Sequence, residues 1–228
     1  MRIVTWNCNG GFARKLPMAM SLCPDLLVLQ EASFRHCEET ALGPFFWTGR
    51  GHRGLAVISC TGLPLTLDPA FDPELPHFLP VHAGTLHLLA IWASVLTSTV
   101  RYVRLIHRAL DHYADFVNHR PGLLIGDLNS STVFDARHPQ ANHTRLVDRL
   151  AHLDYESAWH HQTDECHGAE SRPTFYMYRR PERTWHLDYA FVTRDLLASS
   201  RIELGAPETW LPWSDHLPLI VDLPTLNG

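Results

Sequence analysis

Short runs of apolar residues that end in polar residues recur along this chain. The run at 123–125 leads through Gly126 to Asp127 and Asn129. An apolar run of this length between turn residues is typical of a strand buried on both faces. The polar residues then lie at the carboxyl end of the strand, where α/β proteins usually place their chemistry.

Asp127 and Asn129 are two residues apart, so both side chains point the same way from an extended backbone. The carboxylate can accept a proton and the carboxamide can donate hydrogen bonds, a combination that suits hydrolysis of a charged ester. A strand that merely ends in an Asx turn would carry the same residues. Matching groups at other strand ends favour the chemical interpretation.

The first two predicted strands also end in polar groups. One begins at Arg2 and ends at Asn7 and Asn9. Asn7 could bind a phosphate or a metal-bound water, or could form a turn, and Asn9 is a candidate for substrate binding. The other begins at Pro24 and ends at Glu31, which is either a solvated charge or a ligand for a hard cation. Each group alone is a weak signal.

The rest of the pattern alternates strands with helices. Residues 63–80 contain five prolines and predict an irregular edge with short strands at best. Thr97 or Thr99 can cap a helix that reaches about Asn118. Strands are also predicted at 51–59, 86–93 and 219–223, a hairpin at 173–178 and 185–192, a helix and loop at 35–46, and a helix at 141–152.

Length and charge bound the class of protein. The 228 residues, 45% of them hydrophobic, are enough for one large domain over residues 1–228 with a sizeable core. The net charge of −5 and a pI of about 6.3 argue against a broad surface that coats nucleic acid, although a local basic rim is compatible with them.

The five cysteines are dispersed without CxxC spacing, which predicts reduced thiols and a cytoplasmic setting. Met1 leads directly into the first strand, so we see no signal peptide. The most apolar run, from Leu86 to Leu96, is too short to span a bilayer, and we expect no membrane segment. The sequence indicates no protein partner.

Histidines and arginines form two further groups. His160, His161, Cys166 and His167 could bind zinc, but they lack the paired ligand spacing of a zinc hairpin, so the interpretation as ordinary structural residues is preferred. Three arginines follow one face of the helix predicted before Asn118, and such a stripe is usually a solvated, ion-paired face. They are Arg101, Arg104 and Arg108.

Six short motifs in a fixed order resemble the endonuclease/exonuclease/phosphatase superfamily, which includes exonuclease III-like and DNase I-like nucleases and inositol polyphosphate 5-phosphatases. The resemblance extends from Trp6 to Pro218. It implies an α/β fold in which a two-sheet β-sandwich is flanked by helices, the DNase I-like four-layer sandwich, with the site at one end of the sheets. The motifs are WNCNG, a strand ending in Gln-Glu, GLAVIS, GDLN, HLDYAF and SDHLP.

The resemblance implies a metal site. Glu31 matches the metal-binding glutamate, Asp215 matches a second metal-proximal aspartate, and Asn7 matches an asparagine beside metal and phosphate. Mg²⁺ held by one or two carboxylates keeps several waters and neutralises a phosphodiester before water attacks. We therefore expect Mg²⁺ as the cofactor, with Mn²⁺ as a possible substitute.

The resemblance also implies catalytic roles. Asp127 matches the aspartate that orients and deprotonates the attacking water, and Asn129 matches the asparagine that holds the phosphate oxygens. Asp188 and His216 match a carboxylate–imidazole pair next to the scissile phosphate. A carboxylate favours the charged form of an adjacent imidazole, which would then donate to the phosphate.

Two features bear on the substrate. Nucleases of the superfamily usually place a histidine or tyrosine on the strand before the long helix, whereas this chain has Trp92, which offers an indole N–H but cannot titrate. Phe175, Trp185 and Leu187 lie where abasic-site endonucleases of the superfamily keep a pocket for a flipped-out sugar, although such residues are more often core.

We therefore expect a Mg²⁺-dependent phosphodiester hydrolase, a nuclease that acts on DNA, and endo- and exo-action are equally compatible with the sequence. One alternative is a phosphatase or phosphodiesterase for small molecules or lipid headgroups, for which Arg179, Arg180 and Arg183 could supply a basic cluster. Another is an inactive binding module, which the complete set of carboxylates and the histidine disfavours.

Overall fold

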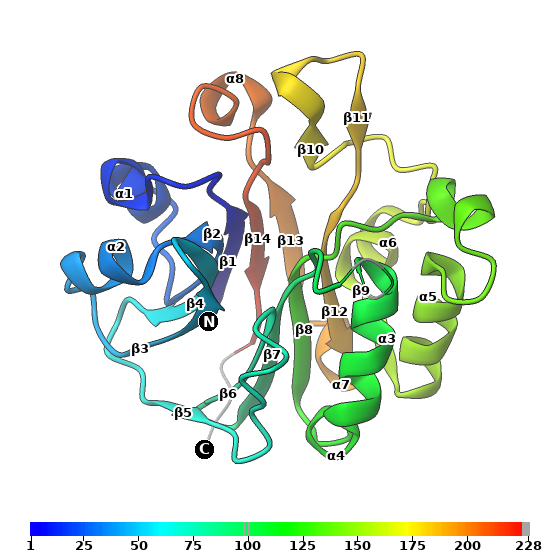
Figure 1. Ribbon diagram of the computed structural model, residues 1–228, viewed down its shortest axis with the longest axis horizontal. Coiled ribbons are helices and arrows are strands. Elements are labelled where there is room, and N and C mark those ends of the chain that lie inside the picture. The colour runs from blue at the N-terminus through cyan, green and yellow to red at the C-terminus, as the bar shows by residue number, and fades with distance from the viewer. Residues whose placement is uncertain (98, 100, 225–228) are drawn as a thin grey trace.

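The computed structural model describes residues 1–97, 99 and 101–224, which form two β-sheets packed face to face with helices on their outer sides (Figure 1). The first sheet is mixed, because β1 runs parallel to β2 and antiparallel to β14. Its six strands lie in the order β13 (Arg201–Leu204), β14 (Leu219–Asp222), β1 (Arg2–Asn7), β2 (Leu26–Ala32), β4 (Arg53–Ser59) and β3 (Phe45–Arg50).

The second sheet is also mixed, with β7 parallel to β8 and the other pairs antiparallel. Its six strands lie in the order β5 (Leu65–Leu67), β6 (Phe78–Ala83), β7 (Leu86–Trp92), β8 (Gly122–Asp127), β12 (Asp188–Thr193) and β9 (Tyr155–Ser157). The expected two-sheet sandwich is thus confirmed, and the polar strand ends identified in the sequence lie at one edge of it. Two short strands, β10 (Phe175–Tyr176) and β11 (Thr184–Trp185), form a separate pair above that edge (Figure 1).

The apolar runs of the sequence are the central strands. In β8, Leu123 and Ile125 belong to the core between the sheets, whereas Leu124 packs under the outer helices. Every residue of β8 is buried. Because successive side chains of a strand point to opposite faces, a strand covered on both sides needs apolar residues at every position.

Helices cover the outer face of each sheet. On the first sheet lie α1 (Phe12–Met20) and α2 (Phe34–Glu39), and on the second lie α3 (Val103–His112), α4 (Ala114–Val117) and α5 (His143–His152) (Figure 1). The shorter elements are α6 (Ala158–Thr163), α7 (Arg194–Leu197), α8 (Pro207–Trp210) and the 3-10 helices η1 (Thr132–Arg137) and η2 (Met177–Arg179). No helix within residues 1–97, 99 and 101–224 is long and apolar enough to cross a membrane.

The long helix predicted from Thr97 or Thr99 to Asn118 is wrong in its start and in its continuity. It begins only at Val103, because Tyr102 has a left-handed φ of 52°. It breaks at Tyr113, where the backbone leaves helical geometry and the hydroxyl accepts a hydrogen bond from the Asp72 amide at 3.3 Å. Burial of the Tyr113 ring outweighs the local preference for a continuous helix.

Two other predicted elements differ from the structure. The second strand of the hairpin expected at 185–192 is divided, since β11 pairs with β10 whereas β12 joins the second sheet. The Thr174 hydroxyl accepts hydrogen bonds from the amides of Leu187 and Asp188, and so holds the chain at this change of partner. The loop expected before residue 46 contains the start of the edge strand β3.

Candidate active site

The carboxyl end of β8 lies very close to the neighbouring strand β7. Gly126 has a φ of 143°, and a Cβ atom at this position would lie 1.9 Å from the Ile91 carbonyl oxygen. Only glycine permits this approach. The next residue, Asp127, is fully buried between the two sheets, and its Oδ1 accepts a hydrogen bond from the Asn129 amide at 2.9 Å.

Asn7, at the end of β1, joins the two sheets at this edge. Its Nδ2 donates to Asp127 Oδ2 at 3.0 Å and to Glu31 Oε1 at 3.3 Å. Asn129 donates from its own Nδ2 to Asp127 Oδ2 at 3.1 Å and to the Ala93 carbonyl at 2.9 Å. Asp127 therefore stands among amide donors that fix the orientation of its carboxylate.

An imidazole lies between two buried carboxylates. His216 Nδ1 is 2.8 Å from Asp188 Oδ2, and its Nε2 is 4.0 Å from Asp127 Oδ2. The backbone of His216 is held on both sides, since its carbonyl accepts from the Trp6 indole at 3.0 Å and its amide donates to Ser214 Oγ at 3.2 Å. The expected pairing of Asp188 with His216 is present in the structure.

The surroundings of these groups shift their titration. Burial opposes protonation of His216, but Asp188 and Asp127 outweigh it and raise the pKa of the imidazole to about 9. Burial raises the pKa of Asp127 to about 7, although His216 acts against the rise. An imidazolium and a carboxylate that ionises near neutrality thus face each other at the sheet edge.

Glu31 lies near the end of β2, where the pairing of β2 with β4 is irregular. The register shifts between Leu29 and Ala32, and Glu31 itself has a left-handed φ of 60°. Its carboxylate forms an ion pair with Arg53, and 19% of the Glu31 side chain is exposed. The bulge turns this carboxylate toward the site edge, and the carboxylate and Asp127 share the amide of Asn7.

Asp215 is connected to the same network through a second asparagine. The Asn9 side chain donates from Nδ2 to Asp215 Oδ1 at 3.2 Å, and the Asn9 amide donates to Asn7 Oδ1 at 3.1 Å. Asn9 and Asn129 are left-handed, with φ values of 47° and 45°. Strained backbone of this kind persists where the surrounding structure over-determines it, often at functional sites.

The carboxylate oxygens at this edge suit a hard divalent cation. Carboxylate oxygens of Asp127 and Asp188 lie within 4.8 Å of each other, beside His216, and Glu31 is reached through Asn7. Asp188 Oδ1 is buried with no hydrogen-bond partner among the described residues. Buried acceptors are nearly always satisfied, so this oxygen indicates a place for a cation, a water or a ligand donor.

The three predicted apolar residues line one pocket, which Asn129 also lines. Phe175, Trp185 and Leu187 enclose about 310 Å³ with Asn129 at its margin. The Phe175 ring lies 4.6 Å from the ring of His216. Sequence reasoning missed the remaining wall of this pocket, which comes from loops and short helices: Tyr102, Phe134, Arg137, His138 and Met177.

Trp92 ends β7 in register with Asp127, on the face that looks into the sandwich. Its ring packs edge-on against His77, with ring centres 5.4 Å apart. Burial lowers the pKa of His77 to about 4, and the ring contacts Ser94 Oγ at 3.2 Å. The position that the superfamily usually gives to a histidine or tyrosine therefore holds an indole supported by a neutral histidine.

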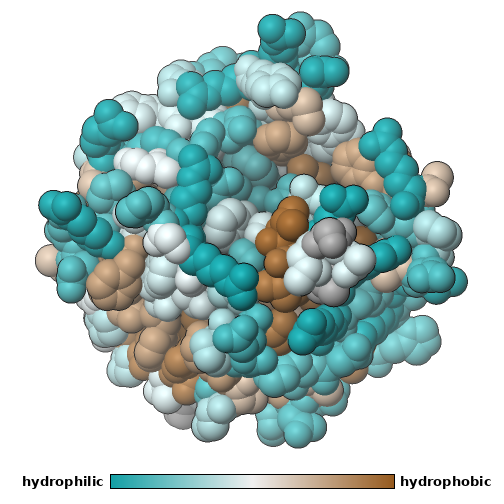
Figure 2. All heavy atoms as spheres, viewed as in Figure 1, coloured by the Kyte–Doolittle hydropathy of each residue, from teal (hydrophilic) through white to brown (hydrophobic). Residues whose placement is uncertain are grey.

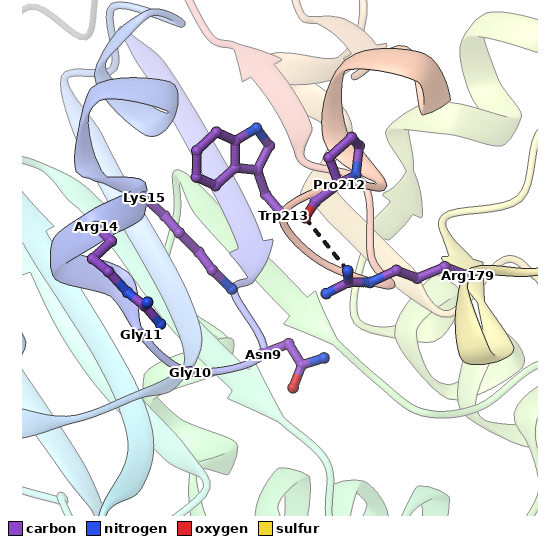
Figure 3. A pocket seen from close by; sticks show the side chains of 8 residues that line it. All are labelled: Asn9, Gly10, Gly11, Arg14, Lys15, Arg179, Pro212 and Trp213. Atoms are coloured by element: carbon purple, nitrogen blue, oxygen red, sulfur yellow. Dashed lines mark hydrogen bonds between the residues drawn. The ribbon is translucent and has the colours of Figure 1, made fainter.

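A second, basic pocket of about 390 Å³ opens next to Asn9 (Figure 3). Figure 3 shows Arg14 and Lys15 from α1 and Arg179 from η2 pointing toward the same space. Burial lowers the pKa of Lys15, and the neighbouring Arg179 and Arg14 lower it further. Arg179 is fixed by a hydrogen bond from its Nη1 to the Pro212 carbonyl at 3.4 Å.

The chain matches the Endonuclease/Exonuclease/phosphatase family over residues 4–216. The protein belongs to this family. As a family member it is an enzyme that hydrolyses phosphoric ester bonds. The family resemblance inferred from the six motifs is confirmed. A comparison with curated proteins finds no match.

Solved structures confirm the fold of this endonuclease/exonuclease/phosphatase family member. A 3'-5' exonuclease (NExo) from Neisseria meningitidis has a TM-score of 0.72 and 20% identity, over 98% of this chain and 99% of that chain. An AP endonuclease from Archaeoglobus fulgidus has a TM-score of 0.71 and 17% identity over the same shares. A third match, at 18% identity and a TM-score of 0.71, is a Neisseria 3' phosphatase NExo bound to product DNA hairpin, again over 98% and 99%.

Proposed function

We propose that this enzyme is a Mg²⁺-dependent phosphodiester hydrolase that acts on DNA. The observation that carries the proposal is the buried arrangement in which His216 stands between Asp188, 2.8 Å away, and Asp127, 4.0 Å away. It combines a proton acceptor with a fixed positive charge at one sheet edge. Hydrolysis of an anionic ester needs both groups within reach of one phosphorus atom.

Asp127 is proposed to accept the proton of the attacking water. Its pKa of about 7 makes it basic enough to take a proton and still largely ionised slightly above neutral pH. The amide donors of Asn7 and Asn129 keep the carboxylate from turning away. A fixed carboxylate orients the water along one direction, which lowers the entropic part of the barrier.

His216 is proposed to donate to a phosphate oxygen and to stabilise the charge that develops there. Asp188 holds the Nδ1 side of the ring, so Nε2 is the nitrogen that faces Asp127 and the reacting phosphate. The raised pKa keeps the ring protonated at neutral pH. Charge stabilisation by a fixed donor in a buried site is among the larger contributions to catalysis.

Asn129 is proposed to hold phosphate oxygens, and Asn9 to bind the substrate. Both N–H groups of the Asn129 amide are engaged, by the Ala93 carbonyl and by Asp127. Binding of a phosphate to this nitrogen would therefore replace its contact with Asp127, which frees that carboxylate for water.

Glu31 and Asp215 are the residues proposed to hold Mg²⁺, with Asn7 beside it, and Mn²⁺ could take its place. Their oxygen donors and the partly exposed carboxylate of Glu31 suit a hard cation that retains waters. When bound, the ion would neutralise phosphate charge. Arg53, which pairs with Glu31, would compete with the ion for this carboxylate.

DNA as the substrate is supported by the two pockets on either side of the catalytic edge. The aromatic pocket of Phe175, Trp185 and Leu187 offers apolar faces to a sugar or an unstacked base. The basic pocket offers Arg14 and Lys15 to a phosphate. The outer surface in the view of Figure 2 is largely hydrophilic, with apolar side chains confined to separate patches.

A small molecule with several phosphates is the second candidate substrate, and one observation favours it. Arg14, Lys15 and Arg179 converge on a single compact pocket (Figure 3). Such a pocket also fits a second phosphate held at a fixed distance from the reacting one.

Hydrolysis of a substrate panel in Mg²⁺ tests the proposal. The panel contains plasmid DNA, a duplex with an abasic site, a 3'-phosphate duplex, RNA, inositol phosphates and bis-p-nitrophenyl phosphate. Cleavage of a DNA substrate that is abolished by EDTA and restored by Mg²⁺ is the expected result. Turnover confined to inositol phosphates would establish the second candidate, and hydrolysis undiminished in EDTA would refute the metal assignment.

A further inference from the structure

A second group of ionisable side chains lies on the outer face of the second sheet, around the ring of Tyr189. Four histidine rings surround it, with ring centres 4.9 Å from Tyr189 for His143 and His186, 6.2 Å for His160 and 6.1 Å for His167. Tyr189 packs in the layer under α3 and α5, whereas its neighbour Asp188 belongs to the catalytic edge. The histidine cluster is therefore separate from the catalytic carboxylates.

Different elements contribute to this cluster. His143 is the first residue of α5, His160 lies in α6, and His186 lies in the link between β11 and β12. His167 and Glu170 belong to the segment that follows α6. Ligand atoms of His160, His167 and Glu170 lie within 4.8 Å of one another.

Three imidazole nitrogens of the cluster are buried with no hydrogen-bond partner in the described part of the chain. They are His143 Nε2, His167 Nδ1 and His186 Nε2. Buried polar atoms of native proteins nearly always have a partner, and each exception calls for an explanation. Three exceptions in one cluster indicate a shared missing partner.

The tautomer of His186 shows what kind of partner is missing. Its Nδ1 lies 2.9 Å from the Arg172 carbonyl oxygen, which can only accept, so Nδ1 carries the hydrogen. Nε2 therefore presents a lone pair inside the protein, on a residue only 3% exposed. A metal-binding histidine usually donates the N–H of one ring nitrogen to a carbonyl or carboxylate oxygen. Its other nitrogen then keeps a free lone pair for the metal.

The charge states agree with a metal site. Burial lowers the pKa of His143 to about 4, and burial with the neighbouring histidines lowers that of His167 to about 3. Both rings are neutral at pH 7, the form that binds metals. Burial opposes ionisation of Glu170, but hydrogen bonds from His160 and the Gly168 amide lower its pKa to about 2, so it is a carboxylate.

We propose that His160, His167 and Glu170 bind a structural Zn²⁺ ion, with Nε2 of His186 or of His143 as the fourth ligand. Imidazole and carboxylate donors in a closed, buried position are typical of zinc. Two imidazoles on one zinc ion hold their ring centres roughly 5–6 Å apart, given Zn–N bonds of about 2.0–2.1 Å. The His143–His167 and His160–His186 distances of 5.4 Å and 6.1 Å match this spacing.

Two adjustments are needed. His160 Nε2 lies 3.2 Å from Glu170 Oε1 and exchanges this hydrogen bond for the ion, while Nδ1 stays 2.7 Å from Ser157 Oγ. The rings of His160 and His167 are stacked, with centres 3.5 Å apart and planes 20° apart, so their lone pairs run side by side. Binding turns the His167 ring out of the stack. His167 is only partly buried, and its Nδ1 has no hydrogen-bond partner among the described residues that this rotation would break.

The cluster differs from the one indicated by the sequence. Of the four residues there, only His160 and His167 lie together, since His161 is exposed near Glu156 and Cys166 is exposed. The other donors come from distant parts of the chain. A bound ion would join α6 either to the link that leads to Asp188, through His186, or to α5, through His143.

Metal titration of the untagged protein, first stripped with a chelator, tests the proposal. It is done in the wild type and in Glu31→Gln, which removes the proposed Mg²⁺ ligand. One equivalent of Zn²⁺ should bind to both proteins in the presence of excess Mg²⁺ and raise the melting temperature by several degrees. Co²⁺ should give the visible absorption bands of a four-coordinate ion. Absence of Zn²⁺ binding in the wild type would overturn the proposal.

Substitutions locate the ion. His167→Gln and Glu170→Gln should lower Zn²⁺ affinity by at least 10-fold, the range seen when a ligand or its support is lost. The matched control is His161→Gln, an exposed histidine of the same segment, which should bind as the wild type does. If His167→Gln has the circular dichroism spectrum of the wild type and binds Zn²⁺ with unchanged affinity, the proposal is overturned. A loss of Zn²⁺ affinity in His186→Asn or in His143→Gln would identify the fourth ligand.

Discussion

Asp127 has surroundings unlike those of an ordinary aspartate on a protein surface. It is fully buried, accepts hydrogen bonds from two asparagine side chains, and lies 4.0 Å from an imidazole nitrogen. Burial favours the neutral acid, whereas the amide donors and His216 favour the carboxylate. The balance leaves a pKa of about 7, which suits a base that works near neutral pH.

Replacement of Asp127 by asparagine should separate chemistry from folding. The change keeps the shape of the side chain but removes the proton acceptor, so we expect kcat to fall by roughly 10²-fold or more. The melting temperature should stay close to that of the wild type. A variant that retained most of its kcat would show that another residue activates the water.

His216 and Asp188 should act as one unit. His216→Ala and Asp188→Asn should each lower kcat by about 10²-fold through lost charge stabilisation, and the double variant should be little worse than either. The cycle is measured by steady-state kinetics on the best substrate of the panel. Fully additive losses would contradict the pairing seen in the structure.

The pKa values of Asp127 and His216 predict that activity rises with pH on the acid side and falls with pH on the alkaline side. The proposed base is ionised Asp127, so kcat/KM should rise as the pH increases through about 7. The proposed hydrogen-bond donor to phosphate is protonated His216, so kcat/KM should fall as the pH increases through about 9. In His216→Ala the alkaline limb should disappear, and the acid limb should move to higher pH because His216 no longer lowers the pKa of Asp127. A retained alkaline limb would assign it to another group.

At the scale of residues, the sequence predicted most of the candidate site and missed its supports. Asp127 and Asn129 could be found because their spacing on a strand end is local. Arg53, which pairs with Glu31, carries no signal in the sequence, and Ser214, which holds His216, belongs to the SDHLP motif but had no role assigned to it. Their roles depend on which strands the fold places side by side.

At the scale of elements, the contact of β8 with β7 depends on one glycine. Gly126→Ala should lower the free energy of unfolding by about 3 kcal/mol, because the new Cβ must displace the Ile91 carbonyl. Gly84→Ala is the matched control, since it also has a positive φ of 61° but meets nothing within 4 Å. The control should cost about 1 kcal/mol. Equal losses in urea unfolding would contradict a specific role for the close approach.

The predicted helices and strands were correct where burial alone determines the residues, and wrong where a specific side-chain contact interrupts an element. Apolar runs predicted the central strands correctly, because burial on both faces leaves no other choice of residues. The break of the long helix at Tyr113 and the division of the hairpin at His186 depend on contacts with Asp72 and Thr174. Those partners are distant in the sequence, so periodicity could not indicate them.

For the whole molecule, buried neutral histidines predict sensitivity to acid. The pKa of His77 falls to about 4 in the folded chain through burial, below its ordinary value of 6.5. The unfolded chain therefore binds a proton first, so stability is complete above pH 6.5 and is lost as the pH falls toward 4. The loss is at most about 1.4 kcal/mol per pH unit.

Urea unfolding across this pH range measures that loss. His77→Gln should flatten the dependence, whereas the exposed His152→Gln should leave it unchanged. The comparison of the two variants cancels the contributions of all other titrating groups. An equal slope in wild type and His77→Gln would show that His77 does not contribute.

The left-handed strand ends at Asn9, Glu31 and Asn129 have a consequence for how the protein can change. Glycine adopts this backbone conformation without the cost of about 1–2 kcal/mol that other residues bear. Glu31→Gly should therefore fold at least as stably as the wild type while it loses metal-dependent activity. A melting temperature well below that of the wild type would contradict this. Selection of variants for thermal stability alone would therefore favour glycine at these positions. The selected protein would be more stable but would have lost its activity.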